Sequence, residues 1–123
     1  MSRILVVDDS KFMRLILKNY FEKDSSARHE VVGEAEDGAS AVAKYKELKP
    51  DLVTMDIIMP TESGLAAVRD IVLFDSNAKI IMVSAMGQEK VVEEALALGA
   101  KGFVTKPVKA EELLLKVKQV LEI

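Results

Sequence analysis

The chain has 123 residues, a formal net charge of -3 and no cysteine, which excludes disulfides and thiolate metal sites. Its length fits a single domain spanning residues 1–123, and its 50% hydrophobic content excludes disorder. The acidic balance argues against nucleic acid as a direct partner, and no apolar run is long enough to cross a membrane. We therefore expect a cytoplasmic monomer that does not act at a membrane.

Short apolar runs alternate along the chain with segments in which apolar residues recur at helical spacing. In chain order, strands are predicted at residues 4–7, 31–35, 52–56, 79–84 and 102–105. The helices between and after them are predicted at about residues 11–23, 41–48, 64–74, 92–98 and 113–121. The chain has to turn at Pro60, and the only histidine, His29, lies in a polar turn where we expect a surface residue.

Strict alternation of strands and helices predicts an α/β fold, a doubly wound parallel sheet with helices on both faces. By analogy with flavodoxin-like (βα)5 proteins, we expect the strand order 2-1-3-4-5. In that order the first and third strands are neighbours, and the carboxyl ends of all strands meet at one edge of the sheet. Polar residues at these ends are therefore the candidates for chemistry.

Acidic residues follow two of the predicted strands. Asp8 and Asp9 end the first strand and Asp56 ends the third. A lone aspartate after a strand usually caps a turn or helix, but three acids brought together repel one another and need a cation. Oxygen ligands without histidine or cysteine select a hard ion, and few protein ligands with room for water favour Mg²⁺ over Ca²⁺.

Two more polar residues follow the fourth and fifth strands. Ser84 ends the fourth strand and Lys106 follows the fifth. Taken singly, each is more often a turn residue or a solvated lysine. Together with a nucleophilic Asp56 and a divalent cation, they are the parts needed to hold a phosphoryl group.

These motifs resemble the receiver domains of two-component response regulators. They are VVDDS at residues 6–10, MDIIMP at residues 55–60 with Gly64, VSA at residues 83–85, and GFVTKP at residues 102–107. The resemblance covers the whole chain, and it is closest to the stand-alone, CheY-like members. It implies a signalling protein of a two-component system that is not an enzyme, apart from assisting its own phosphorylation and autodephosphorylation.

The resemblance also implies a role for individual residues. Asp56 corresponds to the phosphoacceptor. Asp9, Asp56 and the main-chain carbonyl of Ile58 correspond to direct Mg²⁺ ligands, and Asp8 to a metal-site residue that acts largely through water. Lys106 corresponds to the cation that meets the phosphoryl group, and the peptide bond from Lys106 to Pro107 is cis in the family. Ser84 and Phe103 correspond to a switch that alters the surface of the fourth helix, fifth strand and fifth helix.

The partners implied by the resemblance are a CheA-like sensor histidine kinase and a flagellar switch protein or other downstream protein. A separate phosphatase is a further expected partner, because Ile58 and Met86 replace polar residues that orient the attacking water in the enteric chemotaxis regulator. Neither side chain can bond to water in that way, so we hypothesise slow autodephosphorylation. We expect no DNA-binding domain after the fifth helix and no direct contact with nucleic acid.

Other readings of the sequence remain open. An aspartyl-phosphate hydrolase uses the same chemistry but carries its nucleophile in an Asp-x-Asp after the first strand, where this chain has Asp8-Asp9. A flavodoxin-like cofactor binder would place a phosphate against those acids, which would repel it. Within the family, the alternatives are a single-domain phosphorelay intermediate and a receiver excised from a larger regulator.

Overall fold

The computed structural model describes residues 1–59 and 63–123, so the turn predicted at Pro60 lies outside the described residues. Its strands form one parallel sheet in the order β2-β1-β3-β4-β5, which confirms the predicted α/β fold and strand order. The strands are β1 (Ser2–Val7), β2 (His29–Ala35), β3 (Leu52–Asp56), β4 (Ile80–Ser84) and β5 (Gly102–Thr105). The helices are α1 (Lys11–Glu22), α2 (Gly38–Leu48), α3 (Gly64–Phe74), α4 (Glu89–Leu98) and α5 (Ala110–Leu121). None of the helices among these residues is long and apolar enough to cross a membrane.

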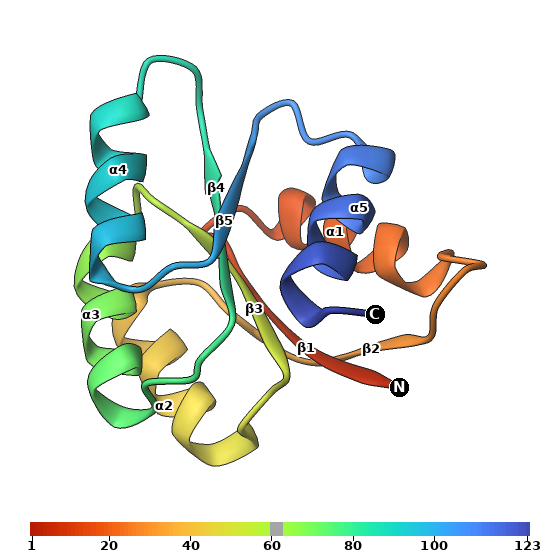
Figure 1. The fold of residues 1–123 in the computed structure, drawn as a ribbon, viewed down its shortest axis with the longest axis horizontal. Coiled ribbons are helices and arrows are strands. Elements are labelled where there is room, and N and C mark those ends of the chain that lie inside the picture. The colour runs from red at the N-terminus through yellow and green to blue at the C-terminus, as the bar shows by residue number, and fades with distance from the viewer. Residues whose placement is uncertain (60–62) are drawn as a thin grey trace.

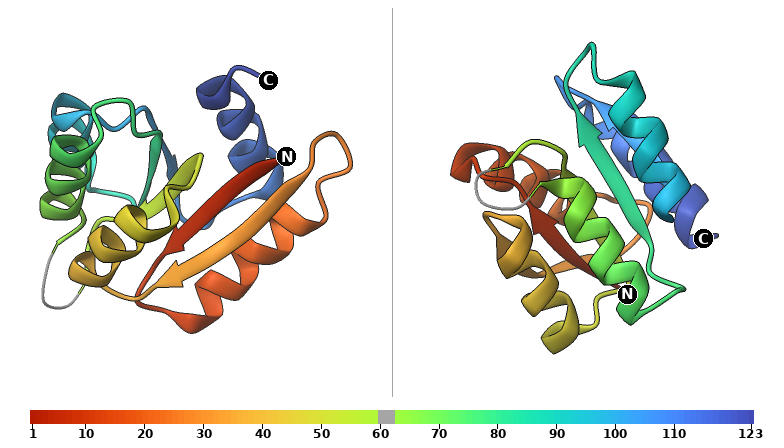
Figure 2. Two further views of the ribbon diagram at one scale, coloured as in Figure 1. Left: turned by 90° about the horizontal axis from the view of Figure 1, so that it is seen from below. Right: turned by 90° about the vertical axis from the view of Figure 1, so that its left-hand side faces the viewer.

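Helices cover both faces of the sheet. Figure 1 shows α1 and α5 on one face and α2, α3 and α4 on the other. The right-hand view of Figure 2 shows the three helices α2, α3 and α4 side by side in front of the sheet. Since parallel strands with helices on both faces are buried on both sides, their sequences are continuous apolar runs rather than alternating ones. Every residue of β3 and β4 is buried, as this architecture requires.

Two apolar clusters, one on each face, hold the helices to the sheet. On the α1 and α5 face, Leu17 and Phe21 of α1 pack with Leu113 of α5 against Ile4 and Ile81 of the strands. Burying one such side chain stabilises the fold by about 1.5–3 kcal/mol. The second cluster lies under α2, α3 and α4 and includes the fully buried Met55 and Met82. The sheet between the clusters is a rigid base for the residues at its carboxyl edge.

Short polar residues start three of the helices directly after this edge. The hydroxyl of Ser10 accepts a hydrogen bond from the amide of Met13 and caps α1. The carboxylate of Asp37 caps α2, and the hydroxyl of Ser63 caps α3. Each cap satisfies an amide that the helix itself leaves free, which typically stabilises a helix by about 1 kcal/mol. Helix α1 begins two residues after Asp9, and α3 begins eight residues after Asp56.

The expectation that His29 is a surface residue is wrong. Its side chain is fully buried, because β2 begins at His29 rather than at residue 31. The imidazole Nε2 lies 3.0 Å from Oδ2 of Asp24, and the ring packs edge-on against Phe21. Asp24 also accepts a hydrogen bond from the amide of Ser26, so the turn folds back and covers the ring.

Candidate functional site

The ends of β1 and β3 bring three acids to one point. Strands β1 and β3 are paired in parallel, with Val7 opposite Met55, so the residues that follow them are neighbours. Carboxylate oxygens of Asp8, Asp9 and Asp56 lie within 4.8 Å of one another, which confirms the predicted convergence. Asp8 and Asp56 are 1% and 6% exposed, whereas Asp9 faces solvent. The pocket is therefore acidic, with two buried members and one that water can reach.

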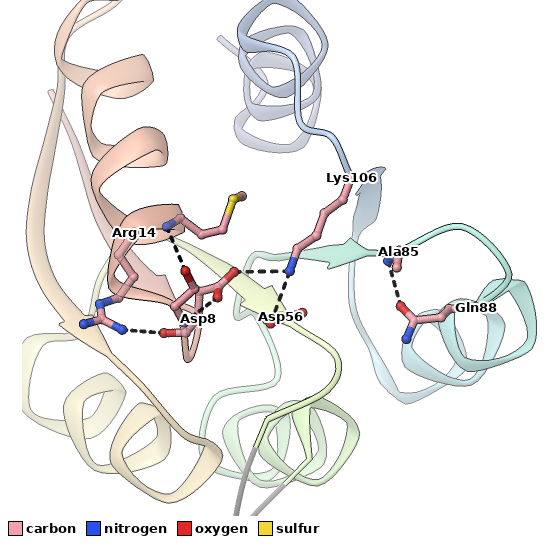
Figure 3. A network of polar contacts seen from close by, with 8 residues as sticks. Asp8, Arg14, Asp56, Ala85, Gln88 and Lys106 are labelled. Atoms are coloured by element: carbon pink, nitrogen blue, oxygen red, sulfur yellow. Dashed lines mark hydrogen bonds and ion pairs between the residues drawn. The ribbon is translucent and has the colours of Figure 1, made fainter.

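Lys106 reaches into this pocket from the end of β5. Its Nζ lies 3.5 Å from Oδ2 of Asp8 and 3.4 Å from Oδ2 of Asp56, and Figure 3 shows the ammonium between the two acids. The lysine side chain is 30% exposed, so its charge is only partly screened by water. One ammonium thus faces the carboxylates contributed by two other strands.

Burial makes the acids hard to ionise. The pKa of Asp56 is raised to about 6, chiefly by desolvation and then by the nearby charge of Asp8, while Lys106 opposes both effects. Desolvation likewise raises the pKa of Asp8, against the hydrogen bond from Ser10 and the charge of Lys106. Loss of water around a carboxylate always disfavours its charged form. The pocket is therefore short of positive charge even with Lys106 in place.

Asp8 is held at every polar atom except one. Its amide donates to the carbonyl of Ala35 at 3.0 Å, and its Oδ1 accepts from the amide of Ser10 at 2.9 Å. Its main-chain carbonyl accepts from Nη1 of Arg14 at 2.7 Å. The remaining oxygen, Oδ2, is buried and accepts no hydrogen bond, although the ammonium of Lys106 lies 3.5 Å away. An unsatisfied buried carboxylate oxygen beside two further carboxylates fits a hard divalent cation, so the donor set suits Mg²⁺.

Ser84 and Phe103 share a cavity beside the acidic pocket. Ser84 is 3% exposed at the end of β4 and lies opposite Thr105 of β5. Phe103 points outward and is 44% exposed. Both line a cavity of about 480 Å³, together with Met86 and other residues of α4 and the loop before it. A movement of Ser84 would therefore change the space available to the Phe103 ring.

The remaining predicted site residues lie at the rim. Ile58 and Met86 are 67% and 82% exposed, so both apolar side chains project into solvent. The peptide bond between Lys106 and Pro107 is cis. Met59, in contrast, is buried in the core under α2, α3 and α4.

Sequence reasoning missed two residues that brace the site. Arg14 bonds to the carbonyl of Asp8 and, through Nε, to Oε1 of Glu34 at 2.9 Å. Gln88 accepts a hydrogen bond from the amide of Ala85 at 2.7 Å and so closes the loop that follows Ser84 (Figure 3). Neither residue lies at the end of a predicted strand, and only the folded chain brings Arg14 and Glu34 together.

Comparison with known proteins decides the family. Residues 4–118 match the response regulator receiver domain. The chain belongs to the response regulator receiver family. This receiver is 55% identical to the chemotaxis protein CheY of Thermotoga maritima over 85% of each chain. It is also 49% identical to protein CcdB of Bacillus subtilis over 98% of each chain.

Solved structures agree with this assignment. The receiver is 39% identical to CheY in the CheX-CheY-BeF3-Mg²⁺ complex from Borrelia burgdorferi, with a TM-score of 0.89 over 97% of this chain and 88% of that one. The resemblance inferred from the motifs is therefore confirmed. The protein is a CheY-like receiver of the kind found in chemotaxis response regulators, a signalling protein rather than an enzyme.

Proposed function

We propose that this receiver takes a phosphoryl group on Asp56 from a phosphohistidine of a sensor histidine kinase. The observation that supports the proposal most directly is the position of Asp56. Its buried carboxylate ends a central strand, with Asp8, Asp9 and Lys106 within a few ångströms. A nucleophile, cation ligands and an ammonium at one point are what phosphoryl transfer needs.

In the proposed reaction, a carboxylate oxygen of Asp56 attacks phosphorus and the phosphorus–nitrogen bond to the histidine breaks. The imidazole leaves with the electron pair of that bond and takes up a proton, and an acyl phosphate is formed. The ammonium of Lys106 binds one phosphoryl oxygen, and the hydroxyl of Ser84 donates to another. Because a phosphoryl group brings a charge of about -1.5 to -2, these donors stabilise the product as well as the transition state.

The carboxylates of Asp8, Asp9 and Asp56 and the main-chain carbonyl of Ile58 are the proposed ligands of Mg²⁺. When bound, the ion supplies the positive charge that lets an anionic phosphoryl group approach three acids. The buried Oδ2 of Asp8 supports this assignment, since it accepts no hydrogen bond and its contact with the Lys106 ammonium at 3.5 Å is an ion pair for which a cation can compete. The exposure of Asp9 supports it too, because Mg²⁺ keeps several of its waters.

Phosphorylation would be read by partners through Ser84 and Phe103. If the hydroxyl of Ser84 moves toward the phosphoryl group, it vacates part of the shared cavity and the outward ring of Phe103 can turn in. The surface of α4, β5 and α5 then loses an exposed aromatic ring. A local change of charge would thus become a change in the shape offered to a partner.

Chemotaxis is the proposed setting, because CheY proteins are among the relatives that match nearly the full chain. The proposed partners are a CheA-like kinase, a flagellar switch protein and a phosphatase resembling CheX, which is bound to the B. burgdorferi relative. These partners imply a cytoplasmic location. The second candidate is a single-domain phosphorelay intermediate, because a receiver that passes its phosphoryl group to a histidine phosphotransferase needs the same acidic pocket.

The test is phosphorylation by acetyl phosphate and Mg²⁺, followed by intact-mass measurement. The wild-type protein should gain the mass of one phosphoryl group, and Asp56→Asn should gain none. Asp70→Asn, which changes a surface aspartate on α3, is the matched control and should behave as wild type. Equal labelling of Asp56→Asn would refute the proposal. Binding of the phosphorylated protein to a flagellar switch protein, compared with phosphoryl transfer to a histidine phosphotransferase, separates the two settings.

A further inference from the structure

Arg14 stands behind the acidic pocket without entering it. It lies in the first turns of α1, and its side chain is only 12% exposed. Nη1 donates to the main-chain carbonyl of Asp8 at 2.7 Å, and Nε donates to Oε1 of Glu34 at 2.9 Å. Figure 3 shows the contact between Arg14 and Asp8; with the bond to Glu34, one guanidinium therefore links α1, the end of β1 and the end of β2.

The carbonyl that Arg14 holds belongs to the peptide group joining Asp8 to Asp9. The orientation of this peptide group sets the direction in which both side chains leave the backbone. The amide of Ser10 fixes one oxygen of the Asp8 carboxylate, which leaves the rotation of the peptide itself to be fixed by the carbonyl. Without Arg14 that carbonyl loses the one side-chain donor it has among the described residues.

We propose that Arg14 is a positioning residue for the cation site, acting through the Asp8 carbonyl on the carboxylates of Asp8 and Asp9. This inference rests on the proposed binding of Mg²⁺ by these acids. Arg14 touches neither the ion nor the phosphoryl group in this proposal. Its planar fork suits the role, because two donors in fixed geometry hold two acceptors at once.

Electrostatics and positioning predict opposite effects when Arg14 is removed. Arg14 carries a positive charge close to an acidic pocket, so a purely electrostatic role would let Mg²⁺ bind more tightly once that charge is gone. A positioning role predicts weaker binding, because the ligands lose their fixed directions. The sign of the change in affinity therefore distinguishes the two roles.

The experiment is a calorimetric titration of the purified full chain with MgCl₂ at constant ionic strength. Arg14→Ala should raise the Kd for Mg²⁺ about tenfold, at the low end of the range found when groups behind metal ligands are removed. Arg14→Lys, which keeps the charge and can still donate to the Asp8 carbonyl, should recover part of the loss. Lys18→Ala removes the same charge four residues further along α1 and should bind Mg²⁺ as the wild type does.

Urea unfolding without Mg²⁺ separates positioning from support of the fold. A purely structural role would lower the free energy of unfolding but leave the Kd of the folded protein unchanged, and that result would overturn the proposal. Tighter binding by Arg14→Ala would overturn it as well. If Arg14→Ala does not fold, Arg14→Met keeps the apolar stem and is held to the same expectation. Failure of the wild-type protein to bind Mg²⁺ would instead refute the proposed cation site.

Discussion

The main-chain carbonyl of Asp56 lies so close to Gly64 that a β-carbon at position 64 would collide with it. The same β-carbon would lie 2.9 Å from the α-carbon of Ile57. The amide of Gly64 donates to the carbonyl of Ile57 at 2.8 Å, which holds the start of α3 against the end of β3. The close approach of α3 to the backbone of Asp56 is thus possible only because residue 64 has no side chain.

Gly64→Ala should lower the free energy of unfolding by about 1–3 kcal/mol, because overpacking against backbone forces a shift of β3 or α3. It should also slow labelling by acetyl phosphate, since the shift moves Asp56. Urea denaturation and intact-mass kinetics measure the two effects. Gly87→Ala is the control. A β-carbon at position 87 would meet no atom within 4 Å, so this substitution should cost only the backbone strain of an alanine at a φ of 89°, about 1–2 kcal/mol. A Gly64→Ala protein with native stability and native labelling would contradict this account.

Lys106→Met should strengthen Mg²⁺ binding while weakening phosphorylation. The ammonium lies 3.4–3.5 Å from Asp8 and Asp56, so it competes with a cation for the same oxygens. Removing a partly exposed charge of this kind is worth about 1 kcal/mol, or roughly a fivefold change in Kd. Titration calorimetry measures the affinity, and intact-mass kinetics measure the phosphorylation. Lys109→Met, at an exposed position just before α5, should change neither, and weaker Mg²⁺ binding by Lys106→Met would count against competition.

The metal-free protein should lose stability as the pH rises from about 4 to about 6. The pKa of Asp56 is about 6 in the folded protein, against 3.8 for an unperturbed aspartate. Between these values the unfolded chain gives up its proton while the folded chain keeps it, which favours unfolding. The shift corresponds to a loss of up to about 3 kcal/mol, complete above the folded pKa.

Urea unfolding in EDTA between pH 4 and pH 7.5 measures this loss. Asp56→Asn should flatten the profile and be more stable than the wild type at pH 7.5, leaving only the smaller contribution of Asp8, whose pKa is also raised. Added Mg²⁺ should restore the stability of the wild type at pH 7.5 but do less for Asp56→Asn. Parallel profiles for the two proteins would show that Asp56 is not the group responsible.

Ile58→Asn and Met86→Glu should each speed the decay of the phosphorylated protein. Both native side chains project into solvent at the rim of the pocket and offer no hydrogen bond to water. A polar group that orients the attacking water typically accelerates such a step by about 10²-fold or more, so even partial placement should give a clear effect. The decay is followed by intact mass after removal of acetyl phosphate. Leu115→Asn, another exposed apolar side chain but on α5, is the control, and unchanged decay in both variants would end the hypothesis.

Much of the fold could be predicted because the buried strands are continuous apolar runs. Residues 52–56 and 80–84 have no competing reading, and a parallel sheet places their polar ends together. The convergence of Asp8, Asp9 and Asp56 could therefore be predicted from the strand order alone, without knowledge of any side-chain contact. Helix starts were predicted less well, since α2, α4 and α5 each begin three residues before the predicted start.

The errors and omissions concern side chains whose partners in the fold cannot be recognised from the sequence. His29 was assigned to the surface because its neighbours are polar, but Asp24 and Phe21 enclose the ring. In the sequence, Arg14 looks like an ordinary charged residue on a helix surface. Only the pairing of β1 with β2 brings Glu34 beside it. Gln88 bonds to a backbone amide rather than capping α4, a choice that the sequence pattern does not encode.

Lys106, the one residue that places an ammonium between the buried acids in the described part of the chain, directly follows the edge strand β5. Strand β5 is one of the two edge strands and has a single neighbour, β4, so Lys106 is attached to a part of the sheet that is supported from one side. A ligand that draws Lys106 into the pocket would also displace the end of β5. A protein that binds β5 would in turn change the free energy with which the ammonium is held in place. By reciprocity the two effects are equal in free energy. Ligand binding in the acidic pocket and partner binding at the edge of the sheet would therefore be coupled through one conformational equilibrium.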